Sequence, residues 1–202
     1  NCFSGLFIAL CANSPIYQNK ITGFHEYRSY LVDSLAEHRF QYRLGMPRVP
    51  FKNLSNYFFE ILKINPLFII KGSKIIDIAN NKKMTFEQYL QGQNWQGCTS
   101  AGEIMKINPQ MRDLLLVQKF YWPECRLRFA FKKEARLSAF LSIYKNNNRL
   151  IAFCRKNLKK LYLEVRSCAA APQGEEMASI ALSLGLLSNL SEAKKLYKSL
   201  GW

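Results

Sequence analysis

The chain has 202 residues, 49% of them hydrophobic and 13% aromatic, so it can bury a sizeable core and is not an intrinsically disordered protein. Its formal net charge of +15 calls for an anionic partner or ligand, such as nucleic acid, an acidic membrane surface or nucleotide phosphates. The apolar run 3–12 is too short to span a bilayer, so we expect no membrane anchor.

The cysteines and histidines exclude several kinds of site. The six cysteines lack zinc-ligand spacing, and the two histidines, His25 and His38, are too few for a histidine-rich metal site or a Ser-His-Asp triad. A chain of this size needs no disulfides to fold. We therefore expect free thiols in a reducing, cytoplasmic environment.

In the first half of the chain, hydrophobic periodicity and turn residues predict helices and one hairpin. The expected helices cover 4–11, 54–63 and 85–92, the last opened by a capping box of Thr85 and Gln88. Two short strands, 66–71 and 74–78, are joined by Gly72-Ser73, a two-residue hairpin loop. Residues 93–104 show no clear pattern and are expected to be irregular.

In the second half, strands with charged faces alternate with helices. The expected helices cover 108–119, with Asn108 as cap, then 134–145, 149–160, 175–187 and a last one capped by Ser191. The expected strands cover 124–131 and 161–166, and the helix over 175–187 should pack against the second strand. The whole pattern predicts an α+β fold, a mixed and mainly antiparallel sheet with helices packed on one face.

The strand 161–166 carries the strongest functional signal. Leu161, Leu163 and Val165 face one way, and Tyr162, Glu164 and Arg166 face the other. A carboxylate beside a guanidinium can hold a divalent cation while the guanidinium binds a phosphate group on that cation. The same sequence pattern also occurs in an ordinary surface ion pair. We expect Glu164 and Arg166 to point into a concave pocket, with the aliphatic side chains packed behind them.

Six segments together resemble the carboxylate–amine ligase family that includes bacterial and plant-type glutamate–cysteine ligases, within the glutamine synthetase superfamily. In chain order they are 12–15 (ANSP), 22–29 (TGFHEYRS), 43–47 (RLGMP), 85–92 (TFEQYLQG), 120–128 (FYWPECRLR) and 162–167 (YLEVRS). The resemblance implies that residues 1–202 are the C-terminal part of a ligase catalytic domain with an incomplete glutamine synthetase-like fold, and that 131–160 are a helical insertion.

The resemblance also implies an activity and a set of site residues. With ATP and Mg²⁺, such a ligase phosphorylates the γ-carboxyl of glutamate or a similar acid, and cysteine or another amine attacks the acyl phosphate. For glutamate and cysteine the product is γ-glutamylcysteine, the first step of glutathione biosynthesis. The implied roles are Glu164 as metal ligand, Arg166 and Arg126 on phosphates, and a substrate pocket made by Arg28, Asn13, Ser14 and Tyr27.

Three alternatives for partners and function stay open. An N-terminal half or a second copy of the chain would complete the site. A catalytically inactive ligase fragment would serve as a structural partner of another protein. A basic nucleic-acid-binding module is the competing function, with Tyr27, Tyr30, Phe40 and Tyr42 between arginines, although the scattered charge and the absence of a binding motif disfavour nucleic acid.

Overall fold

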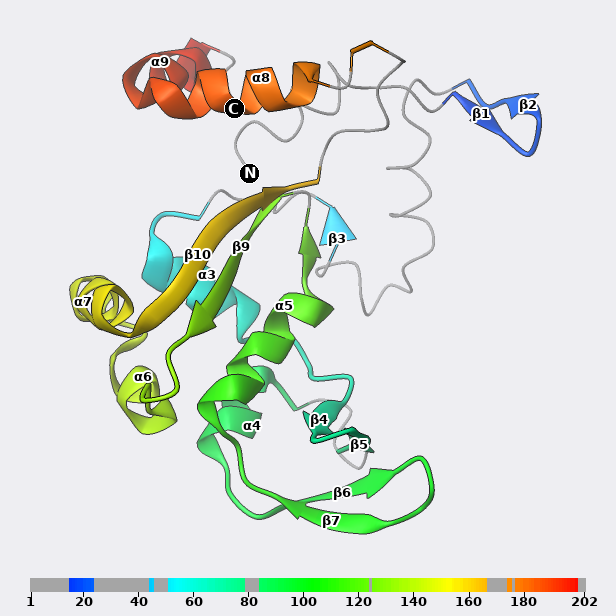
Figure 1. Ribbon diagram of the computed structural model, residues 1–202, viewed down its shortest axis with the longest axis vertical. Coiled ribbons are helices and arrows are strands. Elements are labelled where there is room, and N and C mark those ends of the chain that lie inside the picture. Colours follow the sequence, from blue (N-terminus) through cyan, green and yellow to red (C-terminus); the bar gives the residue numbers. More distant parts are fainter. Residues whose placement is uncertain are drawn as a thin grey trace. The chain divides into compact units, whose positions relative to one another are not determined.

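The computed structural model describes residues 15–23, 44–45, 51–78, 84–123, 125–166, 174–175 and 177–199. The described part is α+β, with short antiparallel strands and helices (Figure 1), which confirms the expected class. The chain forms two compact units, one of Phe51–Trp122 and Leu127–Leu163, the other of Asn1–Pro50, Pro123–Arg126 and Glu164–Trp202. Among the described helices, none is both long and apolar enough to cross a membrane.

The first of these units contains a four-stranded antiparallel sheet in the order β4-β5-β6-β7. Its strands are β4 (Ile69–Lys71), β5 (Lys74–Asp77), β6 (Trp95–Thr99) and β7 (Ile104–Ile107). The predicted hairpin is confirmed, because Lys71 pairs with Lys74 across a loop in which Gly72 has a φ of 61°. A first loop residue with positive φ gives the turn a twist that matches the strands, and glycine adopts it without strain.

The β6–β7 hairpin corrects the prediction that residues 93–104 are irregular. Trp95 pairs with Ile107 and Cys98 with Ile104. The buried positions of β6 after Trp95 are Gly97 and Thr99. These residues are small or polar, so the alternation of burial along this strand leaves no alternation of hydrophobicity in the sequence.

Two helices of this unit begin with a side-chain cap, and the cap of the second was predicted. Helix α3 (Leu54–Ile61) follows Asn53, whose side chain accepts a hydrogen bond from the Asn56 amide, and it ends two residues before the predicted end. Helix α4 (Phe86–Gln91) begins with the predicted capping box of Thr85 and Gln88. Each cap satisfies amide groups that the first helical turn leaves unpaired.

The helix predicted from Asn108 is different in type and start. Residues Met111–Leu116 form a 3₁₀ helix, η2, that continues into the short helix α5 (Val117–Phe120). The backbone N–H of Gln110 donates to Asp113 Oδ2 at 2.9 Å. Asp113 is buried and also accepts from Lys71 Nζ and Tyr89 Oη, at 2.6 and 2.9 Å, so this carboxylate ties η2 to β4 and α4.

Strands β9 (Cys125–Phe131) and β10 (Leu158–Val165) are neighbours, and the helices α6 (Leu137–Ile143) and α7 (Asn147–Asn157) lie between them in sequence (Figure 1). Both strands and both helices were predicted. The helix predicted over 149–160 ends at Asn157, because Leu158 has extended backbone angles and begins β10. The run 158–160 therefore belongs to the strand.

An aromatic core holds α3, β9 and α6 together in this unit. The Phe58 ring lies 5.1 Å from Phe129 and 5.2 Å from Phe140, measured between ring centroids. All three side chains are buried. Their edge-to-face and tilted contacts add to the hydrophobic stabilisation from the buried area.

The second unit contains short strands and two helices at the C-terminal end. Strands β1 (Ile16–Tyr17) and β2 (Lys20–Ile21) pair around a tight turn. Strand β3 (Leu44–Gly45) pairs with β8 (Trp122–Pro123), which spans the boundary between the two units in the sequence. The helix predicted over 4–11 lies outside the described residues. Helix α8 (Ala178–Ser188) begins three residues later than predicted, and none of its residues is buried.

Helix α9 (Leu190–Ser199) has a different cap from the predicted one. The Glu192 amide donates to Asn189 Oδ1, and the Ser191 hydroxyl donates to the same oxygen. Asn, like Ser, is a strong cap residue, and the cap is Asn189 in place of the predicted Ser191. The helix itself was predicted correctly.

Candidate functional site

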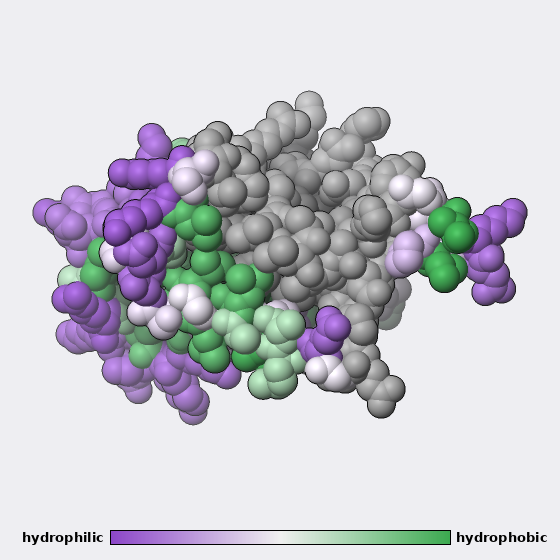
Figure 2. Space-filling model, turned by 90° about the horizontal axis from the view of Figure 1, so that it is seen from above, coloured by the Kyte–Doolittle hydropathy of each residue, from purple (hydrophilic) through white to green (hydrophobic). Residues whose placement is uncertain are grey.

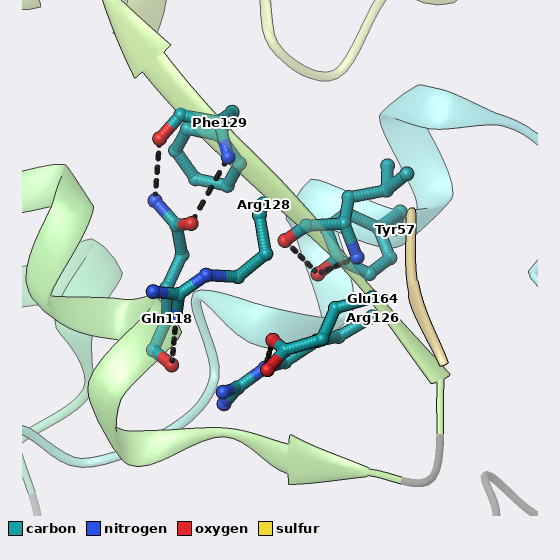
Figure 3. A network of polar contacts seen from close by, with 7 residues as sticks. Tyr57, Gln118, Arg126, Arg128, Phe129 and Glu164 are labelled. Carbon is teal, nitrogen blue, oxygen red and sulfur yellow. Dashed lines mark hydrogen bonds and ion pairs between the residues drawn. The ribbon is translucent and has the colours of Figure 1, made fainter. Parts of the chain in front are cut away.

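Two of the predicted site residues meet between β9 and β10. Arg126 Nε donates to Glu164 Oε2 at 2.6 Å, and 38 residues separate them in sequence (Figure 3). The exposed fraction of the side chain is 9% for Arg126 and 32% for Glu164. The arginine is thus nearly buried, and its carboxylate partner reaches toward solvent.

The chemistry of this pair follows from its burial. A guanidinium removed from water is costly unless an anion compensates it, and the Glu164 carboxylate supplies that compensation. Because Nε makes the contact, the carboxylate fixes the rotation of the guanidinium plane. The sequence assigned Glu164 to a metal and Arg126 to phosphate separately, and it did not predict that the two side chains bind each other.

Further along β9, Tyr57 from α3 contacts the strand backbone. Its hydroxyl donates to the Leu127 carbonyl at 3.4 Å and accepts from the Leu127 amide at 3.2 Å (Figure 3). The Tyr57 side chain is buried. The sequence showed Tyr57 only as part of an amphipathic helix, so this role could not be predicted from it.

Gln118 from α5 makes a similar pair of contacts two residues later. Its Nε2 donates to the Phe129 carbonyl at 2.9 Å, and its Oε1 accepts from the Phe129 amide at 3.0 Å (Figure 3). Leu127 and Phe129 present their backbone groups on the same edge of β9, because they are two residues apart. At both positions, side chains therefore form the hydrogen bonds with the strand backbone that a neighbouring strand would otherwise form.

Arg128 lies next to these contacts. Its Nη1 donates to the backbone carbonyl of Gln118 at 3.4 Å. On β9 the side chains of Arg126 and Arg128 share one face, since successive side chains of a strand alternate. The two guanidinium groups and the Glu164 carboxylate paired with Arg126 together carry two positive charges and one negative charge.

Strand β10 is arranged differently from the prediction. Leu161 and Leu163 are 50% and 44% exposed, so the expectation that they pack behind Glu164 is wrong. Val165 is half-buried, and Arg166 is exposed just beyond the end of the strand. An alternating pattern defines two faces but not which face the rest of the chain covers, and the aromatic core here packs against β9.

The predicted substrate pocket, Arg28, Asn13, Ser14 and Tyr27, lies outside the described residues. A hollow of about 420 Å³ between α8 and α9 is lined by Gly185, Asn189, Glu192 and neighbouring residues, and it contains none of the predicted site residues.

The described residues contain no group of three or more His, Cys, Asp or Glu side chains that could hold a metal ion. Glu164 is a single carboxylate and is bound to Arg126. Mg²⁺ takes about six oxygen ligands, and its sites usually include more than one anionic group. A magnesium ion at Glu164 would therefore need further oxygen ligands besides this carboxylate.

Two of the described cysteines, Cys98 and Cys154, are free thiols, as expected. Burial raises the pKa of the Cys154 thiol to about 11. Because the thiolate is the nucleophile, a buried thiol with a raised pKa is unreactive near neutral pH. Cys154 is therefore part of the core and not a catalytic group.

Comparison with models of protein families, with curated proteins and with solved structures gives no match.

Proposed function

We propose that the chain is the C-terminal part of an ATP-dependent carboxylate–amine ligase of the glutamate–cysteine ligase type. Two arguments support the proposal. The six ordered sequence segments resemble that family, and two of them bring their charged residues together at Arg126 and Glu164. The contact between these two side chains, on neighbouring strands and 38 residues apart, is the single observation that carries the proposal.

In this proposal, Arg126 binds a phosphate or carboxylate group and Glu164 holds the guanidinium in place. Phosphoryl transfer to a carboxylate depends on positioning and on charge stabilisation by cations, which arginines supply. A guanidinium that is already fixed by a carboxylate loses less entropy when it binds an anion. Arg166 and Arg128 supply further positive charge, and Arg28, Asn13, Ser14 and Tyr27 are proposed for the acid substrate.

The proposed reaction uses ATP with Mg²⁺, and bound metal would neutralise phosphate charge. The ligands of that metal are not proposed from the described residues, and Glu164 as one of them stays a prediction. The proposal for the residues of this chain is therefore limited to anion binding and orientation. Glutamate and cysteine are the substrates to test first.

The test measures ATP–Mg²⁺ binding by calorimetry and phosphate release with glutamate and cysteine. Arg126→Gln should weaken nucleotide binding about tenfold or more, since a hydrogen bond to a charged group contributes about 1.5–3 kcal/mol. Glu164→Gln keeps the shape of the pair but removes its charge, so it should weaken binding by a smaller factor. Lys106→Gln removes one exposed charge on β7 and is the matched control.

Because Arg126 is nearly buried, its variant is first compared with the unchanged protein by circular dichroism and thermal unfolding. If the unchanged protein binds no ATP–Mg²⁺, the proposal is wrong. Phosphate release is expected only where an N-terminal half or a second copy of the chain completes the site. If Arg126→Gln and Glu164→Gln, both folded, bind ATP as Lys106→Gln does, the ligand does not contact this pair and the site is elsewhere.

A further inference from the structure

Six basic residues meet where β9 ends, α7 ends and β10 begins. We call this cluster the basic end; its members are Lys132, Lys133, Arg155, Lys156, Lys159 and Lys160, and all six are exposed. Two hydrogen bonds join its parts, because the Lys132 amide donates to the Asn157 carbonyl at 2.8 Å and Lys132 Nζ donates to the Lys156 carbonyl at 2.7 Å. Figure 1 shows α7 and the beginning of β10 side by side at the left.

None of the six members of the basic end forms an ion pair with any of the described residues. Glu134 is the only acidic residue from Leu127 to Leu163, and Glu164, just beyond that range, is paired with Arg126. Like charges repel one another over about one Debye length, which is about 8–10 Å at physiological salt. Holding them together without anions is unfavourable, and a polyanion that bridges them removes that repulsion and releases its own counterions.

Helix α7 favours nucleic acid over a membrane as that polyanion. Its exposed residues are Asn148, Arg149, Ala152, Arg155 and Lys156, without a large apolar side chain among them. Among its apolar residues, Leu150 and Cys154 are buried, and Ile151 and Phe153 are half-buried. A helix that lies on a membrane must insert apolar side chains into it, and α7 has none to insert.

Tyr162 adds an aromatic surface next to these charges. Its side chain is 43% exposed, and Lys160 Nζ lies 4.8 Å from the centroid of its ring. A lysine and an exposed ring on one face of a strand match the way in which single-stranded nucleic acid is bound, with phosphates on cations and bases stacked on aromatic rings. Stacking on Tyr162 requires an unpaired base, so a duplex would not use it.

We propose that the basic end, together with Tyr162, binds single-stranded nucleic acid. The site is separate from Arg126 and Glu164 in its residues and chemistry, and the proposal does not depend on the ligase function. Leu161 and Leu163 are exposed on the other face of β10, so an anionic membrane is the rival that the experiment must exclude.

The experiment measures binding of the full chain to a fluorescein-labelled oligouridylate by anisotropy over a range of salt concentrations. Neutralising Lys156, Lys159 and Lys160 to Gln should lower the affinity about tenfold or more. It should also reduce the slope of log K against log salt by about 2, since each phosphate contact with a single strand contributes about 0.7. Neutralising Lys52, Lys106 and Lys119 to Gln changes the net charge equally at exposed positions outside the cluster and should change the affinity less than about twofold.

The aromatic contact is tested separately. Tyr162→Ala should weaken binding about fivefold or more, and Tyr162→Phe should keep it, because stacking needs only the ring. Equal losses from the two triple variants would overturn the proposal, since net charge alone would then explain the binding. Equal affinity for a duplex of the same length, or binding to phosphatidylserine vesicles in place of the oligonucleotide, would overturn it too. ATP binding by the Lys156, Lys159 and Lys160 variant is measured alongside and should be unchanged, which separates this result from the ligase test.

Discussion

Glu87 shows how one residue links two helices that are far apart in sequence. Its carboxylate accepts a hydrogen bond from the Tyr144 hydroxyl and forms an ion pair of 2.9 Å with Lys145 Nζ, so α4 is tied to the end of α6. The hydrogen bond from Tyr144 is the main reason why the pKa of Glu87 lies below its ordinary value, with Lys145 adding to it. Burial and Glu87 raise the pKa of Tyr144 to about 12.

These pKa shifts predict a pH-dependent contribution to stability. A carboxyl whose pKa is lower in the folded chain than in the unfolded chain stabilises the fold above its unfolded pKa of about 4.3, and this is lost as the pH falls. The free energy of unfolding should therefore differ between the unchanged protein and Glu87→Gln at pH 7, and the difference should shrink toward pH 3. Urea unfolding at several pH values measures it.

Tyr144→Phe is the informative second variant, because the hydrogen bond from the Tyr144 hydroxyl is the main reason why the pKa of Glu87 is lowered. It should remove part of the pH dependence while keeping the ring that stacks on Phe140. Glu60→Gln is the control, since its pair with Lys63 is exposed and contributes little. A difference that stays constant from pH 7 to pH 3 would contradict this role of Glu87.

At the scale of elements, the sequence predicted best where a local chemical rule applies. The Gly72-Ser73 loop and the Thr85 capping box both occur as predicted, because each depends on two to four adjacent residues. Strand β9 was predicted from its alternation. Local rules of this kind hold without information from the rest of the chain.

The elements that were missed depend on distant residues. Strand β6 carries Gly97 where an apolar side chain would mark a strand, because Ile76 and Ile107 from the neighbouring strands fill that space. In the same way, η2 begins at Met111 because Asp113 binds Lys71 and Tyr89 as well as the Gln110 amide. The residues around Gly97 and around Asp113 come from other strands and helices, so they could not be identified from the sequence alone.

The packing around Gly97 predicts the effect of adding one methyl group there. A Cβ at this position would lie 2.4 Å from Ile76 Cγ2 and 2.8 Å from Ile107 Cδ1, far inside contact distance. Gly97→Ala should therefore lower the free energy of unfolding by about 1–3 kcal/mol, the usual cost of overpacking. Urea unfolding measures the loss.

A double-mutant cycle tests the physical reason. Ile76→Ala alone leaves a cavity and destabilises the protein, but combined with Gly97→Ala it makes room for the new methyl group. The two changes together should cost less than the sum of the single changes. Cys98→Ala, at the exposed neighbouring position, is the control. Additive losses would show that Ile76 is not what excludes a side chain at Gly97.

At the scale of the whole molecule, the sequence identified the two strands of the candidate site but not how their residues interact. Arg126 and Glu164 were both selected, and the structure joins them. Tyr57 and Gln118 were missed, because a tyrosine or glutamine on a helix gives no signal that it will bind the backbone of a strand. Four further candidates lie outside the described residues: Asn13, Ser14, Tyr27 and Arg28.

Helices α8 and α9 present an unusual amount of apolar surface. Large hydrophobic side chains are exposed along them at Met177, Ile180, Leu184, Leu187, Leu190 and Leu196. Figure 2 shows the hydrophobic residues over α8 beside the hydrophilic ones over α9. Contiguous apolar surface of this kind is typical of an interface, and burying each side chain contributes about 1.5–3 kcal/mol at most.

This surface predicts that the purified protein associates with itself through α8. In a pure solution the only available partner is a second copy, so the average mass measured by sedimentation should rise with protein concentration. Leu184→Lys and Leu187→Lys together should shift that rise to higher concentrations, because they place charge in the apolar surface. Both positions are exposed, so the fold should be unaffected. Ile104→Lys, at an exposed position on β7, should leave the association unchanged.

Salt distinguishes this association from the binding of nucleic acid. Each copy carries a net charge of +15, so two copies repel each other, and added salt screens that repulsion while leaving the hydrophobic contact in place. Self-association should therefore strengthen with salt, whereas oligonucleotide binding at the basic end should weaken. A mass that does not change with concentration at high salt, or association that Leu184→Lys and Leu187→Lys do not weaken, would show that α8 is not the interface.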